Sequence, residues 1–414
     1  MEDYSQTLSL TFGSDTFATP AFVFALQLVQ QPLTKSSQEV WLVMKITCDR
    51  EKLAGAFQLA ASVALTRSPK EVLQNVKIEA TDSRVTLMAT DMETGIRIDV
   101  EGVDVQTPGK ALLHVGRVGL ILRESSDEQL YFESDGSATI VKGLHSEFNL
   151  PSSNPDEFPT VVGFEEEKYH ELSARLFREM VRRTAFATDA DSSRFALGGV
   201  LLELNGEDVL AVGTDGRRLA RMVGTGKSIG GHETTSNTTI IPTRSLSLME
   251  RSIGDKEETV HIAARGNDVL LRTSRCTIYS RLVEGRYPNW RQVIPKRDDS
   301  VNIQMNVGPF LNVIRQASIV ADQETRGLDL EFGGGTLLLT AKTADLGQSR
   351  VEMPIDYDGD PIKMKLDYRY VSDFLKVLAP DAKFTMDVAS STTPALMTTD
   401  DGYAYVVMPM ALDG

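Results

Sequence analysis

The chain has 414 residues, which at about 150 residues per domain predicts two or three domains. Apolar residues at 41% and charged residues at 24% are typical of soluble globular chains and exclude wholesale disorder. The formal net charge of −15 has the wrong overall sign for a protein that simply coats nucleic acid, although a local basic face is compatible with it. No apolar run reaches the roughly 18 residues of a membrane-spanning helix. Two cysteines, Cys48 and Cys276, are too few for a disulfide framework and favour a reducing, cytoplasmic location.

The first 43 residues differ from the rest of the chain. They contain an apolar patch at Phe22–Leu26 but no Lys or Arg before Lys35. A secretory signal needs a positive start, so we do not interpret this segment as one. We expect residues 1–43 to be an irregular extension and the first domain to begin with the alternating strand at Met44.

Three copies of one pattern follow. Residues 75–91 align with 199–215 at an offset of about 124, and a third copy covers 330–340. Each copy has two apolar-rich runs around a polar or glycine turn, which predicts a β-hairpin. Phe158-Pro159 and Tyr287-Pro288 close the first two units, because proline has no N–H to continue a ladder. We therefore expect three similar domains at 44–163, 164–297 and 298–414.

Amphipathic spacing predicts two helices in each domain. Asp49 is a candidate N-cap of the first helix, while Gly116 and Gly119 weaken the second. Because strands otherwise dominate, the predicted class is α+β, with antiparallel sheets and a few helices on one face. The expected helices cover 49–64, 114–124, 171–187, 242–253, 309–321 and 367–379.

Positive charge gathers on helix faces when residues are projected at about 100° each. A solvated surface would explain any one such face, but three of them in an acidic chain favour a surface that meets a polyanion. Arginine and lysine on a helix suit phosphate contacts, which do not read sequence. The three faces carry Arg175, Arg178 and Arg182; Arg244 and Arg251; and Lys365, Arg369 and Lys376.

No catalytic or metal-ligating pattern is apparent. The five histidines each lie more than twenty residues from the next and none has a cysteine nearby, which argues against zinc. Gly333–Gly335 lacks the Lys-Ser/Thr of a phosphate-binding loop. The acidic pairs Asp189/Asp191, Asp298/Asp299 and Asp400/Asp401 have turn-like contexts that do not favour acid–base or two-metal chemistry. We therefore expect no catalytic residue, no metal and no cofactor.

Three ordered motifs carry a family resemblance. Thr214–Ala220 (TDGRRLA), Leu282–Pro288 (LVEGRYP) and Tyr405–Met410 (YVVMPM) together resemble the bacterial sliding clamp, the β subunit of DNA polymerase III. The resemblance runs from Met44 to about Leu412. It implies a DNA-clamp fold in which two chains pair head-to-tail and close a ring of six domains, with helices lining the hole and sheets outside. The implied function is that of a non-catalytic processivity factor, which encircles double-stranded DNA without sequence specificity.

The same resemblance implies a pocket between the second and third domains. This pocket would bind short peptide motifs of the polymerase III catalytic subunit, the clamp loader and other replication and repair proteins. The matching positions are Arg194, Leu197, Thr214, Gly216, Arg217, Arg218, Leu219, Pro242, Leu246, Val406, Val407, Met408, Pro409 and Met410.

The resemblance also implies an assembly interface and one more DNA contact. The interface would pair Phe148 and Leu150 of the first domain with Ile319 and Val320 of the third. Arg67, after the first helix, matches a DNA-facing position. Two other classes of function remain open from the residues: a hydrolase that uses an acidic pair such as Asp189/Asp191, and a non-catalytic β-rich scaffold protein.

Overall fold

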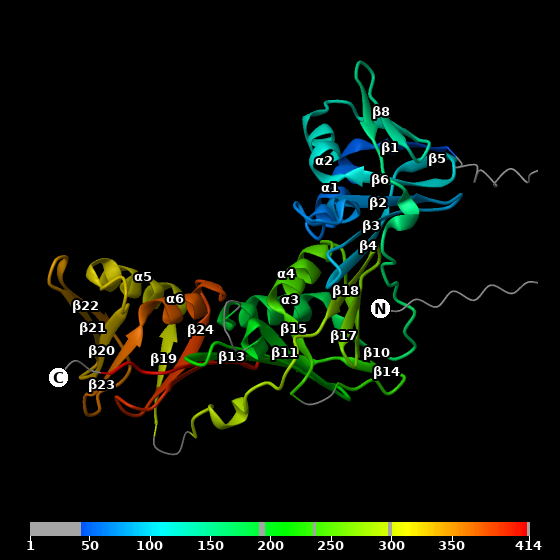
Figure 1. Cartoon of the computed structure of the whole chain (residues 1–414). Coiled ribbons are helices and arrows are strands. Elements are labelled where there is room, and N and C mark those ends of the chain that lie inside the picture. The colour runs from blue at the N-terminus through cyan, green and yellow to red at the C-terminus, as the bar shows by residue number, and fades with distance from the viewer. Residues whose placement is uncertain (1–42, 190–194, 235–236, 297–299, 412–414) are drawn as a thin grey trace, which may run out of the picture. The chain divides into compact units, whose positions relative to one another are not determined.

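The structure is a computed structural model that describes residues 43–189, 195–234, 237–296 and 300–411. The predicted extension therefore lies outside the described residues, except for Val43. The chain forms three domains that repeat one order of elements: a strand, a helix, several strands, a second helix and three more strands (Figure 1). This confirms the predicted α+β class and the threefold repeat.

The first domain begins at the strand expected from Met44. Its two helices contact each other, and the predicted 75–91 hairpin is formed by β2 and β3. Its elements are β1 (Met44–Asp49), α1 (Arg50–Ala61), β2 (Asn75–Ala80), β3 (Val85–Thr90), β4 (Thr94–Val100), β5 (Val103–Thr107), β6 (Gly109–His114), α2 (Val115–Glu124), β7 (Gln129–Ser134), β8 (Ala138–Lys142) and β9 (Glu147–Pro151).

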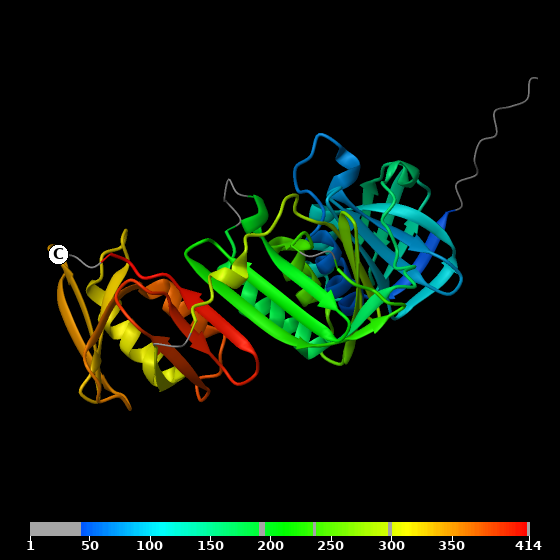
Figure 2. The same cartoon turned by 90° about the horizontal axis from the view of Figure 1, so that it is seen from below.

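The second domain repeats this order, and its predicted hairpin is formed by β11 and β12. Seen from below in Figure 2, green strands of this domain lie in front of its helices. Its elements are β10 (Tyr169–Ser173), α3 (Ala174–Thr184), β11 (Gly199–Asn205), β12 (Asp208–Thr214), β13 (Arg218–Thr225), β14 (Lys227–Ile229), β15 (Ile240–Pro242), α4 (Thr243–Ser252), β16 (Thr259–Arg265), β17 (Asp268–Arg272) and β18 (Cys276–Arg281).

The third domain contains the third predicted hairpin, formed by β20 and β21. Gly334 and Gly335 at its turn both have positive φ, which glycine adopts at little cost. Its elements are β19 (Val301–Asn306), α5 (Val307–Ala317), β20 (Gly327–Gly333), β21 (Thr336–Thr343), β22 (Gly347–Pro354), β23 (Ile362–Asp367), α6 (Tyr368–Lys376), β24 (Lys383–Val388), β25 (Ala395–Thr398) and β26 (Tyr403–Val407).

The strands form four antiparallel sheets, two of which cross a domain boundary. β18 of the second domain pairs with β4 of the first, with Ile278 opposite Ile96. β13 of the second domain pairs with β26 of the third, with Leu219 opposite Val406. The sheet orders are β5-β1-β7-β8-β9, β14-β10-β16-β17-β18-β4-β3-β2-β6, β15-β11-β12-β13-β26-β25-β24-β19 and β22-β21-β20-β23.

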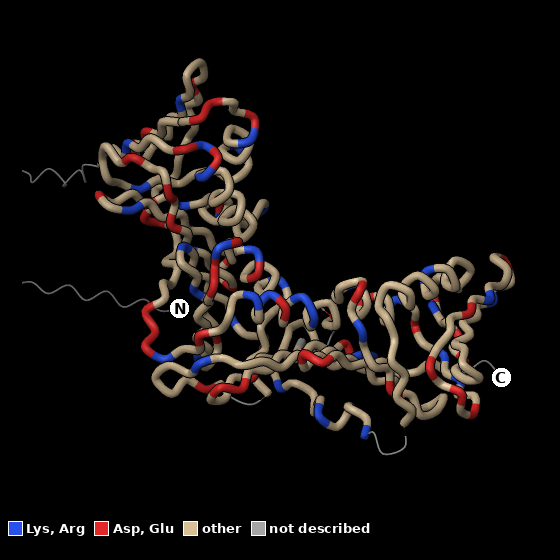
Figure 3. The backbone as a smooth tube through the Cα atoms, turned by 180° about the vertical axis from the view of Figure 1, so that it is seen from behind, with Lys and Arg blue, Asp and Glu red and all other residues tan. Residues whose placement is uncertain are grey.

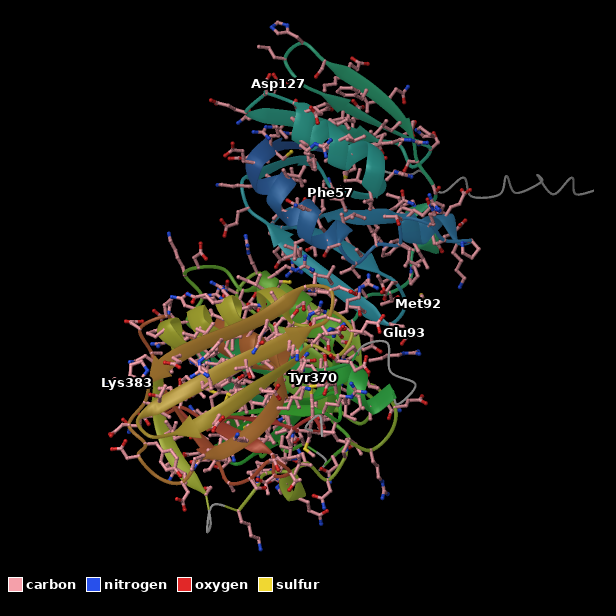
Figure 4. The ribbon with its side chains drawn as sticks, turned by 90° about the vertical axis from the view of Figure 1, so that its left-hand side faces the viewer. Phe57, Met92, Glu93, Asp127, Tyr370 and Lys383 are labelled. Atoms are coloured by element: carbon pink, nitrogen blue, oxygen red, sulfur yellow. The ribbon has the colours of Figure 1, made fainter. Side chains whose placement is uncertain are left out.

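The turn between β3 and β4 reinforces the first of these junctions. Met92 has a φ of +79°, and Glu93 beside it bonds Arg281 of β18 through both its backbone carbonyl and its side chain. Both residues are labelled in Figure 4. A non-glycine residue in this left-handed conformation is uncommon, so the junction stabilises a backbone geometry that is costly in isolation.

The helices form because each has an apolar stripe that the sheets cover. In α1, Leu53, Phe57 and Ala60 are buried, and Phe57 is labelled in Figure 4. Asp49 accepts a hydrogen bond from the backbone N–H of Lys52, which confirms the predicted N-cap. Burying a side chain such as Phe57 contributes about 1.5–3 kcal/mol relative to leaving it exposed. This places the core of each domain between the helices and their sheets.

All six predicted helices are present, and each is shorter than expected. The stretch predicted from 171 begins as β10, and α3 starts only at Ala174. In the third domain, Lys365 lies on β23 opposite Asp329, and α6 begins at Tyr368. The predicted helical face through Lys365 is therefore wrong, because the strand continues to Asp367, which caps α6 through the N–H of Arg369.

Candidate partner pocket and basic helices

A small apolar cavity lies at the junction of the second and third domains. It has a volume of about 110 Å³. Its lining comes from the start of β13 and the turn before it, the end of β12, the end of β26 and the residue after it, the segment that follows β18, and one residue just before β11: Leu197, Thr214, Gly216, Arg217, Arg218, Leu219, Pro288, Trp290, Val293, Val406 and Met408.

The floor of this pocket is a cross-strand pair. Leu219 of β13 lies opposite Val406 of β26, and both side chains are fully buried. On the same face of the sheet they join a cluster with Tyr287 and Trp290, which lies apart from the core under the helices. The Tyr287 hydroxyl donates to the carbonyl of Val212 at 2.8 Å and fixes the covering segment onto the sheet.

The rim of the pocket exposes apolar side chains. Met408 is 41% exposed and Val293 is 40% exposed, unusual values for residues that border a buried cluster. The N–H of Met408 donates to the carbonyl of Arg217 at 2.9 Å, which holds the chain after β26 alongside β13. A concave apolar site with exposed apolar edges suits an incoming leucine or aromatic side chain.

The Thr-Asp-Gly-Arg motif forms the turn beside the pocket. The Asp215 carboxylate accepts from the backbone N–H groups of Arg217 and Arg218 at 2.9 and 3.0 Å. The Thr214 hydroxyl donates to the carbonyl of Arg218. Gly216 has a φ of +90°, which a side chain would strain. The motif therefore encodes a rigid turn, which fixes the first residues of β13.

Arg218 joins the second domain to the third. Its side chain is 10% exposed and donates to Asp215 at 2.9 Å, to Asp373 of α6 at 2.8 Å and to the carbonyl of Phe186 at 2.7 Å. Its guanidinium also lies 4.5 Å from the centre of the Tyr370 ring. With these partners satisfied, Arg218 builds the wall of the pocket and has little capacity left for a ligand.

Eight of the fourteen predicted pocket residues line the cavity, and Arg194 lies outside the described residues. Pro242 and Leu246 do not line it, because Pro242 ends β15 and Leu246 is buried on the core face of α4. Val407 points to the opposite face of β26, as strand alternation requires, and is part of the main core. Pro409 and Met410 also lie outside the lining, and Met410 pairs with Lys365.

Sequence reasoning missed one wall of the pocket. Pro288, Trp290 and Val293 belong to the segment that was interpreted only as the end of the second domain. An apolar Tyr-Pro…Trp…Val run after the last strand of a domain was the available signal. The apolar side chains of such a run have to be buried, and here they pack against the sheet that contains β13 and β26.

The predicted DNA-facing residues differ in how free their charges are. On α3, Arg175 is exposed and Arg182 pairs with Glu179, whereas Arg178 donates to the carbonyls of Ile253 and Gly254 at the end of α4. On α4, Arg244 lies 3.4 Å from Asp91, and Arg251 is exposed. The faces are thus basic but not free of acid, and blue and red segments are interspersed throughout Figure 3.

The other predicted cations lie elsewhere. Arg67 is exposed in the loop after α1, Arg369 is exposed on α6, and Lys376 pairs with Asp373 at 3.3 Å. Lys365, on β23, is not on this helix face. Arg178 serves the packing of α3 against α4, because it donates to the carbonyls of Ile253 and Gly254, which follow the last residue of α4.

The predicted interface residues lie beside edge strands. Phe148 and Leu150 are on β9, which ends the five-stranded sheet, and Phe148 is 39% exposed. Ile319 and Val320 are in a 3-10 turn, Ser318–Val320, that contacts β22 at the edge of the four-stranded sheet. Ile319 is 74% exposed. Exposed apolar residues beside an unpaired strand edge are a ready surface for another chain.

Among the described residues, no group of three or more His, Cys, Asp or Glu side chains could hold a metal ion.

His170 and His232, far apart in sequence, do come together, with their Nδ1 atoms 2.7 Å apart. Burial lowers the pKa of both imidazoles. Cys48 and Cys276 are both buried as free thiols, and burial raises their pKa to about 12. Asp401 of one predicted acidic pair bonds Arg183 at 2.6 Å, while Asp191, Asp298 and Asp299 lie outside the described residues.

No helix in the part of the chain that the structure describes is long and apolar enough to cross a membrane.

Three consecutive blocks of the chain match family models of the DNA polymerase III beta subunit. The N-terminal domain matches 44–162, the central domain 171–289 and the C-terminal domain 291–411.

The chain is similar to curated beta sliding clamps over most of its length. It is 26% identical to the one from Pseudomonas putida over 372 residues and 27% identical to the one from Caulobacter vibrioides over 386 residues. Each alignment covers 89% of this chain and all of the relative.

Solved structures show the same fold. The DNA polymerase III subunit beta from Pseudomonas aeruginosa has a TM-score of 0.81 at 25% identity, covering 89% of this chain and 100% of that one. The DNA polymerase sliding clamp from Bacillus subtilis has a TM-score of 0.83 at 23% identity with the same coverage, a likeness of fold.

Proposed function

The chain belongs to the family of bacterial DNA polymerase III β subunits, the sliding clamps, and on this premise we propose how its parts serve that function. It is a sliding clamp, the processivity factor of DNA polymerase III. The proposal has three elements: a ring of two copies, a basic lining around duplex DNA, and a pocket for partner peptides. The clamp acts in the cytoplasm as an accessory subunit without an active site, and its domains span 44–163, 164–297 and 298–414.

The ring forms when β9 of one copy meets β22 of the other. Both are edge strands, and Phe148 and Leu150 lie beside one edge while Ile319 and Val320 lie beside the other. Pairing two edges satisfies backbone groups and buries apolar area at about 25 cal/mol per Å². Two identical head-to-tail contacts close the ring, since each chain supplies one edge of each kind.

The DNA contact is electrostatic and independent of sequence. Arg175 and Arg251, which are exposed, together with Arg67 and Arg369 are the cations best placed for phosphate contacts. Arg182, Arg244 and Lys376 are exposed, but each is paired with a carboxylate of its own. Such contacts are individually weak and screened by salt, so retention on DNA depends on encirclement.

The apolar cavity at the junction of β13 and β26 is the observation that carries the partner function. It would bind peptide motifs with leucine and phenylalanine anchors from the polymerase catalytic subunit, the clamp loader and repair proteins. Its volume suits one such side chain, while Met408 and Val293 provide apolar edges for a second.

The test is fluorescence anisotropy with a labelled peptide from the C-terminus of the polymerase III catalytic subunit of the same host. Met408→Ala and Val293→Ala should each weaken binding about tenfold, since truncating an anchor contact costs on the order of 1–2 kcal/mol. Leu346→Ala is the matched control, since Leu346 is 52% exposed and outside the pocket lining. Equal affinities for all three variants would place the peptide elsewhere.

A further inference from the structure

A larger cavity lies where the first and second domains join, and it shares no lining residue with the partner pocket. It has a volume of about 650 Å³. In its base, Thr277 of β18 lies opposite Arg97 of β4 and also opposite Arg272 of β17. Residues opposite each other in a sheet project from the same face, and neighbouring strands are about 4.8 Å apart. The two arginines therefore flank the Thr277 hydroxyl in a single row across the junction.

The segment between the two domains positions both arginines. Arg97 donates from Nη1 to the carbonyl of Val161 at 3.2 Å. The Arg272 guanidinium lies 4.6 Å from the centre of the Phe164 ring, and its Nη2 donates to Nδ1 of His261 at 2.6 Å. Because these partners are neutral, they orient the guanidinium groups without cancelling their charge.

The charge of the cavity is not balanced by its own carboxylates. Two of its five arginines have acidic partners: Arg265 pairs with Asp268 at 2.6 Å and with Glu166 at 2.9 Å, and Arg84 lies 3.7 Å from Asp99. Three have no carboxylate partner among the described residues, namely Arg97, Arg272 and the exposed Arg275. The lining contains one carboxylate besides Glu166 and Asp99, namely Glu165, and it is exposed. The lining thus holds five arginines and three carboxylates, an excess of positive charge in a chain whose net charge is −15; two further carboxylates stand just outside the lining, Asp268 on Arg265 and Glu257 on Ser274.

We propose that this cavity binds a small, multiply charged phosphate anion, such as pyrophosphate or the triphosphate group of a nucleotide. Guanidinium groups present paired N–H donors that match phosphate oxygens, and the Thr277 hydroxyl adds a donor between Arg97 and Arg272. Arg275, in the turn before β18, also lines the cavity and is exposed, so it can add a further donor. A bound anion would contact both domains and the segment between them, so it would stabilise the junction of β18 with β4.

The test is isothermal titration calorimetry of the full chain at low ionic strength with sodium pyrophosphate and, separately, with ATP. One site per chain is expected, and pyrophosphate should displace ATP. Arg275→Gln should weaken binding about tenfold, because it removes a hydrogen bond donated by a charged group. Arg272→Gln combined with Arg275→Gln should weaken it about a hundredfold.

Arg281→Gln is the matched control, because Arg281 is an exposed arginine on the same strand that lies outside this cavity. Circular dichroism identifies any variant that fails to fold, and Arg275→Gln keeps the test decisive because that side chain is exposed. Absence of heat with both anions would overturn the proposal, as would equal weakening by Arg281→Gln. A short single-stranded oligonucleotide that binds there without competition from pyrophosphate would also overturn it, in favour of a nucleic-acid surface.

Discussion

Arg218 offers the sharpest test of how the second and third domains are joined. Arg218→Met keeps an unbranched apolar side chain in place but removes three donated hydrogen bonds, to Asp215, Asp373 and the carbonyl of Phe186. Removing one partner of a buried ion pair costs about 3–5 kcal/mol, because the remaining charge stays desolvated. Asp373 is 32% exposed and can regain water, while Asp215 at 13% cannot to the same extent. We therefore expect a loss of about 3 kcal/mol, at the lower end of this range.

The loss of unfolding free energy can be measured by guanidinium-induced unfolding followed by Trp290 fluorescence. Trp290 reports on the junction of the second and third domains because it is buried and lines the pocket there. The control is Arg350→Met, which removes an exposed ion pair with Glu352 at 2.7 Å. Pairs of this kind contribute about 0–1 kcal/mol. If the two variants lost equal stability, the interpretation of Arg218 as a buried link between domains would be refuted.

Three further predictions follow from the structure. Replacing Ile319 and Val320 with glutamate should give a folded monomer that is not retained on circular DNA, and a dimer in analytical ultracentrifugation would contradict the interface. Deleting Met408–Gly414 should abolish binding of the polymerase peptide but leave the dimer, since the backbone bonds of Met408 and Met410 are to the carbonyls of Arg217 and Lys365 and not to β9; loss of the dimer would show that the segment is structural. His170 and His232 have lowered pKa values in the folded state, so the unfolded chain binds more protons and stability should fall as the pH drops below about 6.5. His170→Gln should reduce this slope in urea unfolding from pH 7.5 to 5, and an unchanged slope would assign it to other groups.

The repeated fold could be predicted because its signals are local. The hairpins at 75–91, 199–215 and 330–340 and the N-cap at Asp49 depend on residues close in sequence, and all of them are present. The boundaries were less accurate. The spacing of four residues between Lys365 and Arg369 suits one helix face. In the structure, however, Lys365 lies on β23, which ends at Asp367, and only Arg369 lies on α6.

The pocket could be predicted only in part, for a physical reason. The turn at Thr214–Arg218 and the strand Tyr403–Val407 were found because each is a continuous motif. Trp290 and Val293 were missed because no local pattern tells which sheet a covering segment will reach. Pro242 and Leu246 do not line the cavity, since helix periodicity identifies the buried face of α4 but not the neighbour that buries it.

The strand pairs β18–β4 and β13–β26 have a mechanical consequence. Each junction is a ladder of five residue pairs, so bending one domain against the next would have to break backbone hydrogen bonds in the middle of a sheet. Deformation of the chain should therefore be distributed as a small change of twist over many strands and should not be concentrated at a hinge in the connecting segments. Two such chains would separate most easily at the edges of their sheets, because separation there leaves the strand pairs that join the domains intact.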